Sequence, residues 1–158
     1  MSSFLELGVP ASLVAVLNAT DRSTPFPIQQ DTLPDSIAGR DVLGRGRTGS
    51  GKTIAFAIPL VANIAQDVDK KRQPNRPRGI VLAPTRELVT QIAEVIKMLG
   101  DPVGVRVSTI FGGVPQRRQD DDQARVSARS TLGPLPLVVG VLGDLAVQPI
   151  ASALGSPA

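Results

Sequence analysis

The sequence of 158 residues predicts an α/β fold built on a parallel β-sheet. Short apolar runs typical of buried strands occur at 41–44, 79–83 and 103–111. Helical patterns at 52–66 and 85–99 separate these runs. Strands that alternate with helices in this way are joined by right-handed crossovers, so we expect helices on both faces of the sheet.

Two helices are expected before the first strand. Apolar residues recur at helical spacing over 10–19 and predict the first helix. Pro27 suits the first turn of a second helix, which runs to Ile37. Gly39 is placed to end that helix, because glycine readily adopts the left-handed conformation found there.

The second half of the chain continues the alternation. The run Gly79–Ala83 is apolar throughout, as in a strand buried on both faces. Thr85 is expected to cap the following helix and Gly100 to end it. A fourth strand is expected at 137–142.

The composition excludes several kinds of chemistry. The chain has no cysteine and no histidine, which rules out disulfides, zinc–thiolate sites and serine–histidine triads. Trp and Tyr are also absent. Function must therefore use Lys, Arg, carboxylates, hydroxyls, amides and backbone groups.

The charge distribution suggests where an anionic partner would bind. Ten basic and five acidic residues lie in 62–119, which fits either such a partner or a solvated basic loop around 70–72. The start of the chain lacks the pattern of a secretory signal, and the apolar stretch 132–147 is too interrupted to span a membrane. We expect a cytoplasmic protein with no membrane association.

The segment 46–53 carries the strongest motif. It reads Gly-Arg-Thr-Gly-Ser-Gly-Lys-Thr and satisfies G-x-x-x-x-G-K-[ST], the P-loop pattern. A chance glycine-rich turn is the alternative, but an expected strand before the segment and a helix after it favour a phosphate loop. The candidate nucleotide-binding residues are Arg47, Thr48, Gly49, Ser50, Gly51, Lys52 and Thr53. Lys52 would contact the terminal phosphates and Thr53 would bind Mg²⁺; these two are the catalytic candidates.

A second motif precedes the loop and carries a family resemblance. Phe4 and Leu7-Gly8-Val9 lead to Pro25-Phe26-Pro27-Ile28-Gln29 at the separation seen in a Q motif. Together with 46–53, this order resembles the first RecA-like domain of DEAD-box ATP-dependent RNA helicases, bacterial ones in particular. The resemblance implies a P-loop NTPase fold with a RecA-like parallel sheet, here incomplete.

The resemblance also assigns roles within the Q motif. Gln29 would hydrogen-bond the adenine edge and favour ATP over GTP, because an amide offers a donor and an acceptor side by side; alternatively it is a solvated helix residue. Pro25 joins the nucleotide-binding candidates. Arg22 stands where the family has an aromatic that stacks on the base, and Asp21 stands in place of a glycine. Arg22 could stack through its guanidinium plane.

A third motif implies RNA binding. The string Ala-Pro-Thr-Arg-Glu-Leu-Val-Thr-Gln at 83–91 matches the family's motif Ia, and a Gly-Gly pair follows at 112–113. By resemblance the RNA-binding candidates are Pro84, Thr85, Arg86, Glu87, Gly112 and Gly113. Without the resemblance, Thr85 is a helix cap and Glu87 a first-turn acid.

The rest of the family pattern does not occur in this sequence. The strings Asp-Glu-Ala-Asp and Ser-Ala-Thr are missing, as is a second RecA-like domain; by resemblance the acidic string would fall after residue 158. Residues 138–145 either correspond to the family's Thr-Pro-Gly-Arg element, with Asp144 in place of its arginine, or match by accident. We therefore expect 1–119 to be the N-terminal part of the ATP-binding domain and 120–158 a divergent tail with one strand and a helix.

Two accounts of the chain's function stay open. The family couples ATP hydrolysis, with Mg²⁺, to RNA unwinding, but this chain by itself is expected not to turn over. It is either a module that binds an adenine nucleotide and RNA, alone or with other helicase or RNA-processing proteins, or a truncated product without function. A disrupted helicase gene and a genuine short protein both fit the sequence.

Overall fold

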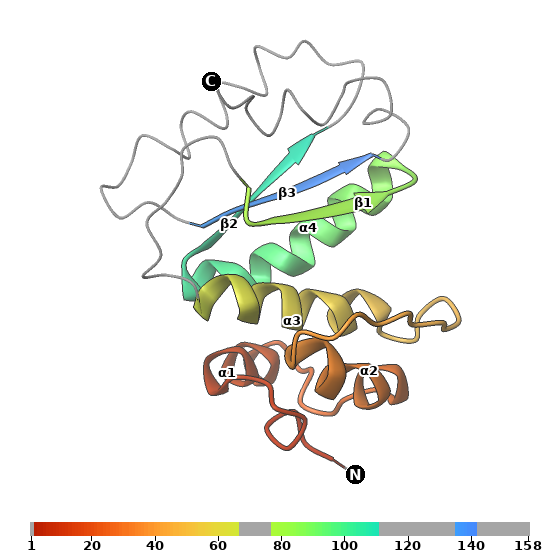
Figure 1. Cartoon of the computed structure of the whole chain (residues 1–158), viewed down its shortest axis with the longest axis vertical. Coiled ribbons are helices and arrows are strands. Elements are labelled where there is room, and N and C mark those ends of the chain that lie inside the picture. The colour runs from red at the N-terminus through yellow and green to blue at the C-terminus, as the bar shows by residue number, and fades with distance from the viewer. Residues whose placement is uncertain (1, 67–76, 111–134, 142–158) are drawn as a thin grey trace.

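The computed structural model describes residues 2–66, 77–110 and 135–141. Four helices, a 3₁₀ turn and three strands form in the order shown in Figure 1: α1 (Ala11–Ala19), α2 (Pro27–Ile37), α3 (Lys52–Gln66), β1 (Gly79–Ala83), α4 (Arg86–Gly100), η1 (Asp101–Val103), β2 (Val105–Ile110) and β3 (Leu135–Val141). All the helices predicted in this part of the chain are confirmed. Gly39 follows α2 with φ of 79°, as a helix-ending glycine does.

The three strands form one parallel sheet in the order β1-β3-β2. The register pairs Ala83 with Val141 and Ile110 with Gly140, so the carboxyl ends of all three strands lie at one edge of the sheet. The strand expected near 137–142 is therefore confirmed, and it occupies the centre of the sheet. Parallel pairing requires the crossover connections that the alternating pattern predicts.

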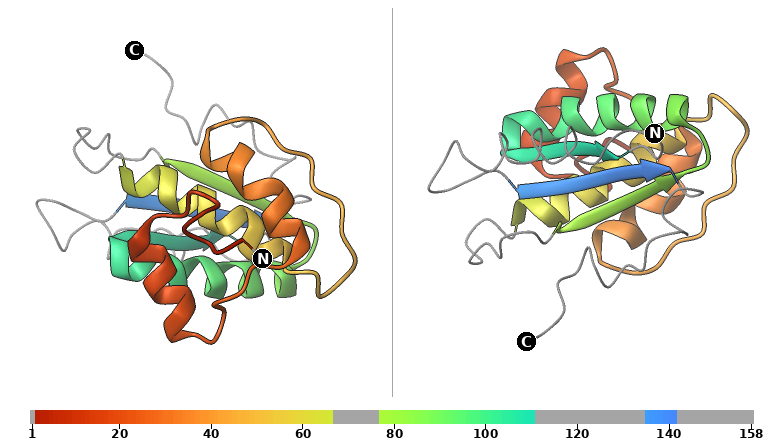
Figure 2. Two further views of the ribbon diagram at one scale, coloured as in Figure 1. Left: turned by 90° about the horizontal axis from the view of Figure 1, so that it is seen from below. Right: turned by 90° about the horizontal axis from the view of Figure 1, so that it is seen from above.

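The described helices all lie on one side of this sheet (Figures 1 and 2). Along β1, Val81 and Ala83 turn toward the helices, whereas Ile80 and Leu82 are 53% and 48% exposed. The prediction of a β1 buried on both faces is wrong. In the described part of the chain, the helices cover one face of the sheet.

The prediction of a strand at 41–44 is also wrong. These residues adopt no regular structure, and Leu43 is 97% exposed. A strand is stabilised by pairing with neighbours, and the described strands pair only with one another. Val42 and Leu43 are too short an apolar run to hold an extended segment on the sheet without a partner strand beside it.

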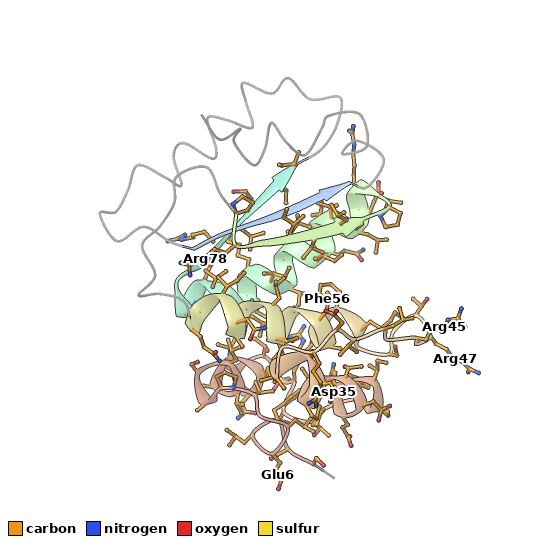
Figure 3. The ribbon with its side chains drawn as sticks, viewed as in Figure 1. Glu6, Asp35, Arg45, Arg47, Phe56 and Arg78 are labelled. Atoms are coloured by element: carbon orange, nitrogen blue, oxygen red, sulfur yellow. The ribbon has the colours of Figure 1, made fainter. Side chains whose placement is uncertain are left out.

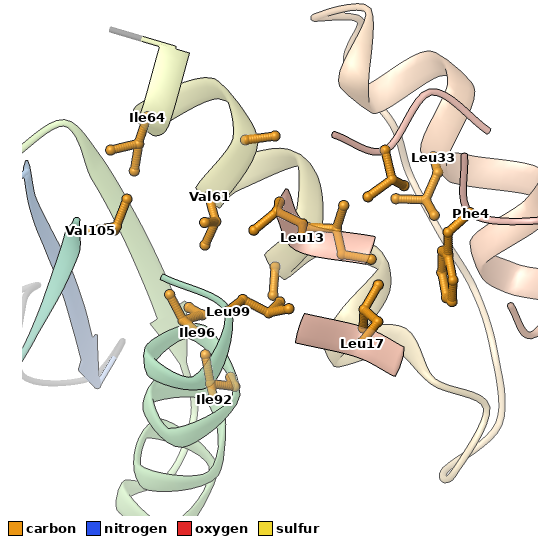
Figure 4. Packing of buried hydrophobic residues seen from close by; sticks show 14 of the residues in the cluster. Phe4, Leu13, Leu17, Leu33, Val61, Ile64, Ile92, Ile96, Leu99 and Val105 are labelled. Atoms are coloured by element: carbon orange, nitrogen blue, oxygen red, sulfur yellow. The ribbon is translucent and has the colours of Figure 1, made fainter. Parts of the chain in front are cut away.

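The hydrophobic core surrounds α3 (Figure 4). Residues from the N-terminal helices, including Leu13, Leu17 and Leu33, are fully buried on one side of α3. Ile96 and Leu99 of α4 are fully buried on the other. Seven residues of α3 itself are buried: Ala55, Ala57, Ile58, Pro59, Val61, Ala62 and Ile64. None of the helices that the structure describes could cross a membrane.

Candidate functional site

The segment 46–53 forms a tight loop that leads directly into α3. Gly49 and Gly51 have φ of 80° and 83°, in the left-handed region that other residues rarely adopt. A Cβ on Gly46 would lie 2.6 Å from the Ser50 Oγ, so a side chain there would require the Ser50 hydroxyl to move. Gly49 and Gly51 are thus required by the path of the chain. The loop meets the N-terminus of a 15-residue helix whose dipole favours anions.

The ammonium group of Lys52 is folded back over this loop. Its Nζ donates to the carbonyl oxygens of Gly46 and Arg47, at 2.6 and 2.5 Å. A phosphate group would offer the same ammonium stronger, charged acceptors. Figure 3 shows the side chains of Arg45 and Arg47 pointing away from the body of the molecule at this end, where they add positive charge.

The donors around the loop fit a phosphate ligand. The Ser50 Oγ is buried and has no hydrogen-bond partner within the protein. An orphaned hydroxyl of this kind calls for a ligand or a water molecule. Thr53 lies beside Lys52 in the first turn of α3 and is half-buried. Backbone N–H groups, an ammonium and two hydroxyls are the set that a nucleotide's phosphates and a bound Mg²⁺ require.

Gln29 ties the start of α2 to the loop. Its side chain is 1% exposed, its Nε2 donates to the Gly51 carbonyl oxygen at 3.0 Å, and its Oε1 accepts from the Phe26 backbone N–H at 2.9 Å. Both ends of the amide are therefore engaged within the protein. The predicted contact with an adenine edge would require Gln29 to exchange at least one of these hydrogen bonds.

Arg22 is directed elsewhere. Its Nη1 donates to the Thr20 carbonyl oxygen at 3.0 Å and contacts the Met98 sulfur, on α4, at 3.6 Å. Asp21 beside it has φ of 55°, a left-handed conformation that explains why a glycine suits this position. Arg22 and Gln29 thus contact different parts of the molecule: Arg22 contacts α4, whereas Gln29 contacts the loop. Pro25 is buried, and its carbonyl oxygen accepts from the Gln30 Nε2.

The motif Ia residues lie where β1 ends and α4 begins. Thr85 is the N-cap of α4, and its Oγ1 accepts from the Leu88 N–H at 3.3 Å. Pro84, Arg86 and Glu87 are exposed at the same point. This is the edge at which the carboxyl ends of the three strands meet. Gly112 and Gly113 lie outside the described residues, as does the part of 138–145 beyond Val141.

Replacing Thr85 with alanine is expected to lower the free energy of unfolding by about 1 kcal/mol, because α4 loses its N-cap. Chemical denaturation followed by circular dichroism measures this change. Thr90→Ala is the matched control, since the Thr90 hydroxyl only donates to a carbonyl oxygen within α4 and alanine favours a helix interior. Equal midpoints for the two variants would show that Thr85 does not stabilise α4.

One contact at the loop has no counterpart in the sequence prediction. The ring of Phe26 packs against Gly51: a Cβ on that glycine would lie 2.9 Å from the Phe26 Cδ2. The Q motif that the sequence resembles reads Pro-Thr-x-Ile-Gln, so Phe26 stands in place of its threonine. That departure is the signal that could have drawn attention to Phe26. An open groove of about 360 Å³ lies between α4 and β2. It is lined by Thr90, Ala93, Glu94, Lys97, Val107 and Thr109, and none of these is a predicted site residue.

Comparison with known proteins places this arrangement in context. The family described as DEAD/DEAH box helicase matches residues 26–146. ATP-dependent RNA helicase DBP8 of Eremothecium gossypii is 44% identical over 112 residues, which are 71% of this chain and 24% of that protein. The chain therefore spans about a quarter of the length of this relative.

Solved structures agree with this match. The crystal structure of the RNA helicase Prp28 from Chaetomium thermophilum bound to ADP aligns with a TM-score of 0.73 and 33% identity, over 92% of this chain and 33% of that one. A hypothetical ATP-dependent RNA helicase from Sulfolobus tokodaii aligns with a TM-score of 0.66 and 27% identity, over 85% and 34% of the two chains. The RecA-like fold predicted from the sequence is thus confirmed, in incomplete form.

Proposed function

Because the chain belongs to the DEAD/DEAH box helicase family, we propose that it binds an adenine nucleotide at 46–53 and RNA at Pro84–Glu87. The observation that carries the nucleotide proposal is the loop itself, in which Lys52 closes over backbone carbonyls and Ser50 has a buried, unpartnered hydroxyl. The ADP named with the similar Prp28 structure supports an adenine nucleotide as the ligand.

The proposed roles follow from the placement of the groups. Lys52 would exchange its two backbone acceptors for phosphate oxygens, and Thr53 would hold Mg²⁺ with the terminal phosphates. Gln29 would keep Gly51 in the conformation that the phosphates need. Hydrolysis and RNA unwinding belong to the longer helicases that this chain resembles.

The test is a titration of the purified chain with a fluorescent ATP analogue in the presence of Mg²⁺. Saturable binding of one nucleotide per chain, reversed by unlabelled ATP, is the expected result. Omitting Mg²⁺ should weaken binding. A signal that unlabelled ATP does not displace would contradict the proposal, since it would show that the dye rather than the nucleotide is bound.

The RNA proposal rests on the shared edge of the sheet. Arg86 is exposed in the first turn of α4, where the helix dipole also favours phosphate. The register pairs Ala83 with Val141, so the end of β3 lies beside the end of β1 at this edge. RNA held there would contact few phosphates, and its affinity should depend only weakly on salt.

Replacing Arg86 with alanine is expected to weaken binding of a single-stranded RNA several-fold at low salt and to reduce the slope of log K against log salt by about one. Fluorescence anisotropy at several salt concentrations measures both. Arg106→Ala is the matched control: it removes the same charge from an exposed site near the start of β2, at the opposite edge of the sheet. Equal loss in both variants would indicate non-specific attraction and contradict the proposed surface.

A further inference from the structure

Phe26 is a large apolar residue at an unusual position, the start of a helix. It is 52% exposed, and it is the N-cap of α2, where Ser, Thr, Asp or Asn would accept a hydrogen bond from the first turn. A phenyl ring cannot accept that bond. The Gln29 backbone N–H donates instead to the Phe26 carbonyl oxygen at 2.9 Å, and the Phe26 N–H donates to the Gln29 Oε1. The backbone of Phe26 therefore serves the start of α2, whereas its ring supplies no cap and is about half open to solvent.

The ring also lies beside the phosphate loop. A Cβ on Gly51 would be 2.9 Å from the Cδ2 and 3.3 Å from the Cγ of Phe26. Gly51 immediately precedes Lys52, whose ammonium closes the loop. The half-exposed ring of Phe26 thus packs against the residue that precedes Lys52, and Lys52 carries the ammonium that would hold a nucleotide's phosphates.

We propose that the ring of Phe26 is the surface on which the purine base of the bound nucleotide stacks. This inference rests on the nucleotide binding proposed above and adds the group that recognises the base. Every base presents a flat π-face, and stacking on an aromatic side chain needs no hydrogen bond from the protein. This fits a site in which the Gln29 amide is engaged with backbone groups and Arg22 is held against Met98.

The absence of Trp from the sequence gives a direct test. Phe26→Trp introduces a single indole at the proposed stacking surface, and its emission is followed during titration with Mg²⁺–ATP or with inorganic tripolyphosphate. ATP is expected to quench the emission strongly and tripolyphosphate, which lacks a base, to leave it nearly unchanged. Leu5→Trp is the control, because Leu5 is exposed in the N-terminal turn and neither ligand should alter its emission.

A second pair of variants separates stacking from a merely structural contact. Phe26→Leu keeps an apolar side chain against Gly51 and loses the aromatic face; Phe26→Thr restores a helix-capping residue. Calorimetry should show that both variants bind ATP about tenfold more weakly than the wild type, with tripolyphosphate affinity unchanged. An equal loss for ATP and tripolyphosphate would mean that the ring only shapes the loop, and the proposal would be overturned.

The failures of the two proposals are distinguishable. In one case, the wild type binds ATP and tripolyphosphate with equal affinity, and ATP does not change the emission of the Phe26→Trp variant. The protein would then have a phosphate site but no stacking surface. Wild-type chain that binds neither ligand would overturn the nucleotide site itself and the stacking surface with it. Selective quenching by ATP, together with the tenfold selective loss in Phe26→Leu, supports both.

Discussion

Replacing Lys52 with alanine is expected to weaken binding of Mg²⁺–ATP about 100-fold. Hydrogen bonds to a charged group contribute up to about 3 kcal/mol, and that free energy corresponds to about 100-fold in affinity. The stability of the unliganded protein should change little, because the Lys52 ammonium donates to two carbonyl oxygens of an exposed loop. Competition against the fluorescent ATP analogue measures the change.

Lys97→Ala is the matched control for this loss of charge, since Lys97 lies exposed in the last turn of α4. It should bind ATP as the wild type does. Circular dichroism should show the same unfolding midpoint for Lys52→Ala and the wild type. If Lys52→Ala retained wild-type affinity, the motif at 46–53 would be a glycine-rich turn and the nucleotide proposal would be wrong.

Replacing Gln29 with glutamate is expected to lower the free energy of unfolding by about 3 kcal/mol. The change is nearly isosteric, but it converts the Nε2 donor into an oxygen that faces the Gly51 carbonyl oxygen. It also buries a negative charge that keeps the hydrogen bond from the Phe26 N–H but loses its second partner. Part of the loss can be relieved if the carboxyl group takes up a proton, so the variant should be less unstable in acid. Denaturation with guanidinium, followed by circular dichroism at two pH values, measures both effects.

Gln30→Glu provides the comparison for Gln29→Glu. Gln30 is the next residue of α2, only half-buried, and its Nε2 donates to the Pro25 carbonyl oxygen. Gln30→Glu should lower the free energy of unfolding clearly less than Gln29→Glu does. It should also leave the affinity for ATP within a few-fold of the wild type. Similar losses in the two variants would show that Gln29 has no special role in holding the loop.

The sequence predicted the elements whose stability is local. The helices α1 to α4 depend on apolar spacing, on Pro27 at a helix start and on Thr85 as a cap, all of which are visible in the chain. The loop at 46–53 was equally visible, because its glycines are required by backbone geometry that depends on nearby residues.

The failures concern features that depend on distant partners. The segment 41–44 has the residues of a strand, but strand formation needs a neighbour, and the described sheet places none there. Exposure of Ile80 and Leu82 has the same origin: a continuous apolar run predicts burial only if both faces of the sheet are covered.

The hydrogen bond from Gln29 to Gly51 joins residues 22 positions apart. It could not be read from residue spacing, although the two motifs were each identified. The packing of Phe26 against the same glycine was hidden for the same reason, because a sequence shows an unusual residue but not what it touches.

The irregular backbone at 41–47 determines how the two proposed sites could communicate. In the described part of the chain, no strand joins the phosphate loop to the sheet that ends at Pro84–Glu87. The loop is held by α2, and α3, which follows it, packs against both α4 and β2. Allosteric coupling between nucleotide and RNA would therefore pass through the side-chain packing around α3 and not along a strand. Cooperativity between the two proposed sites would then depend on core side chains that belong to neither site.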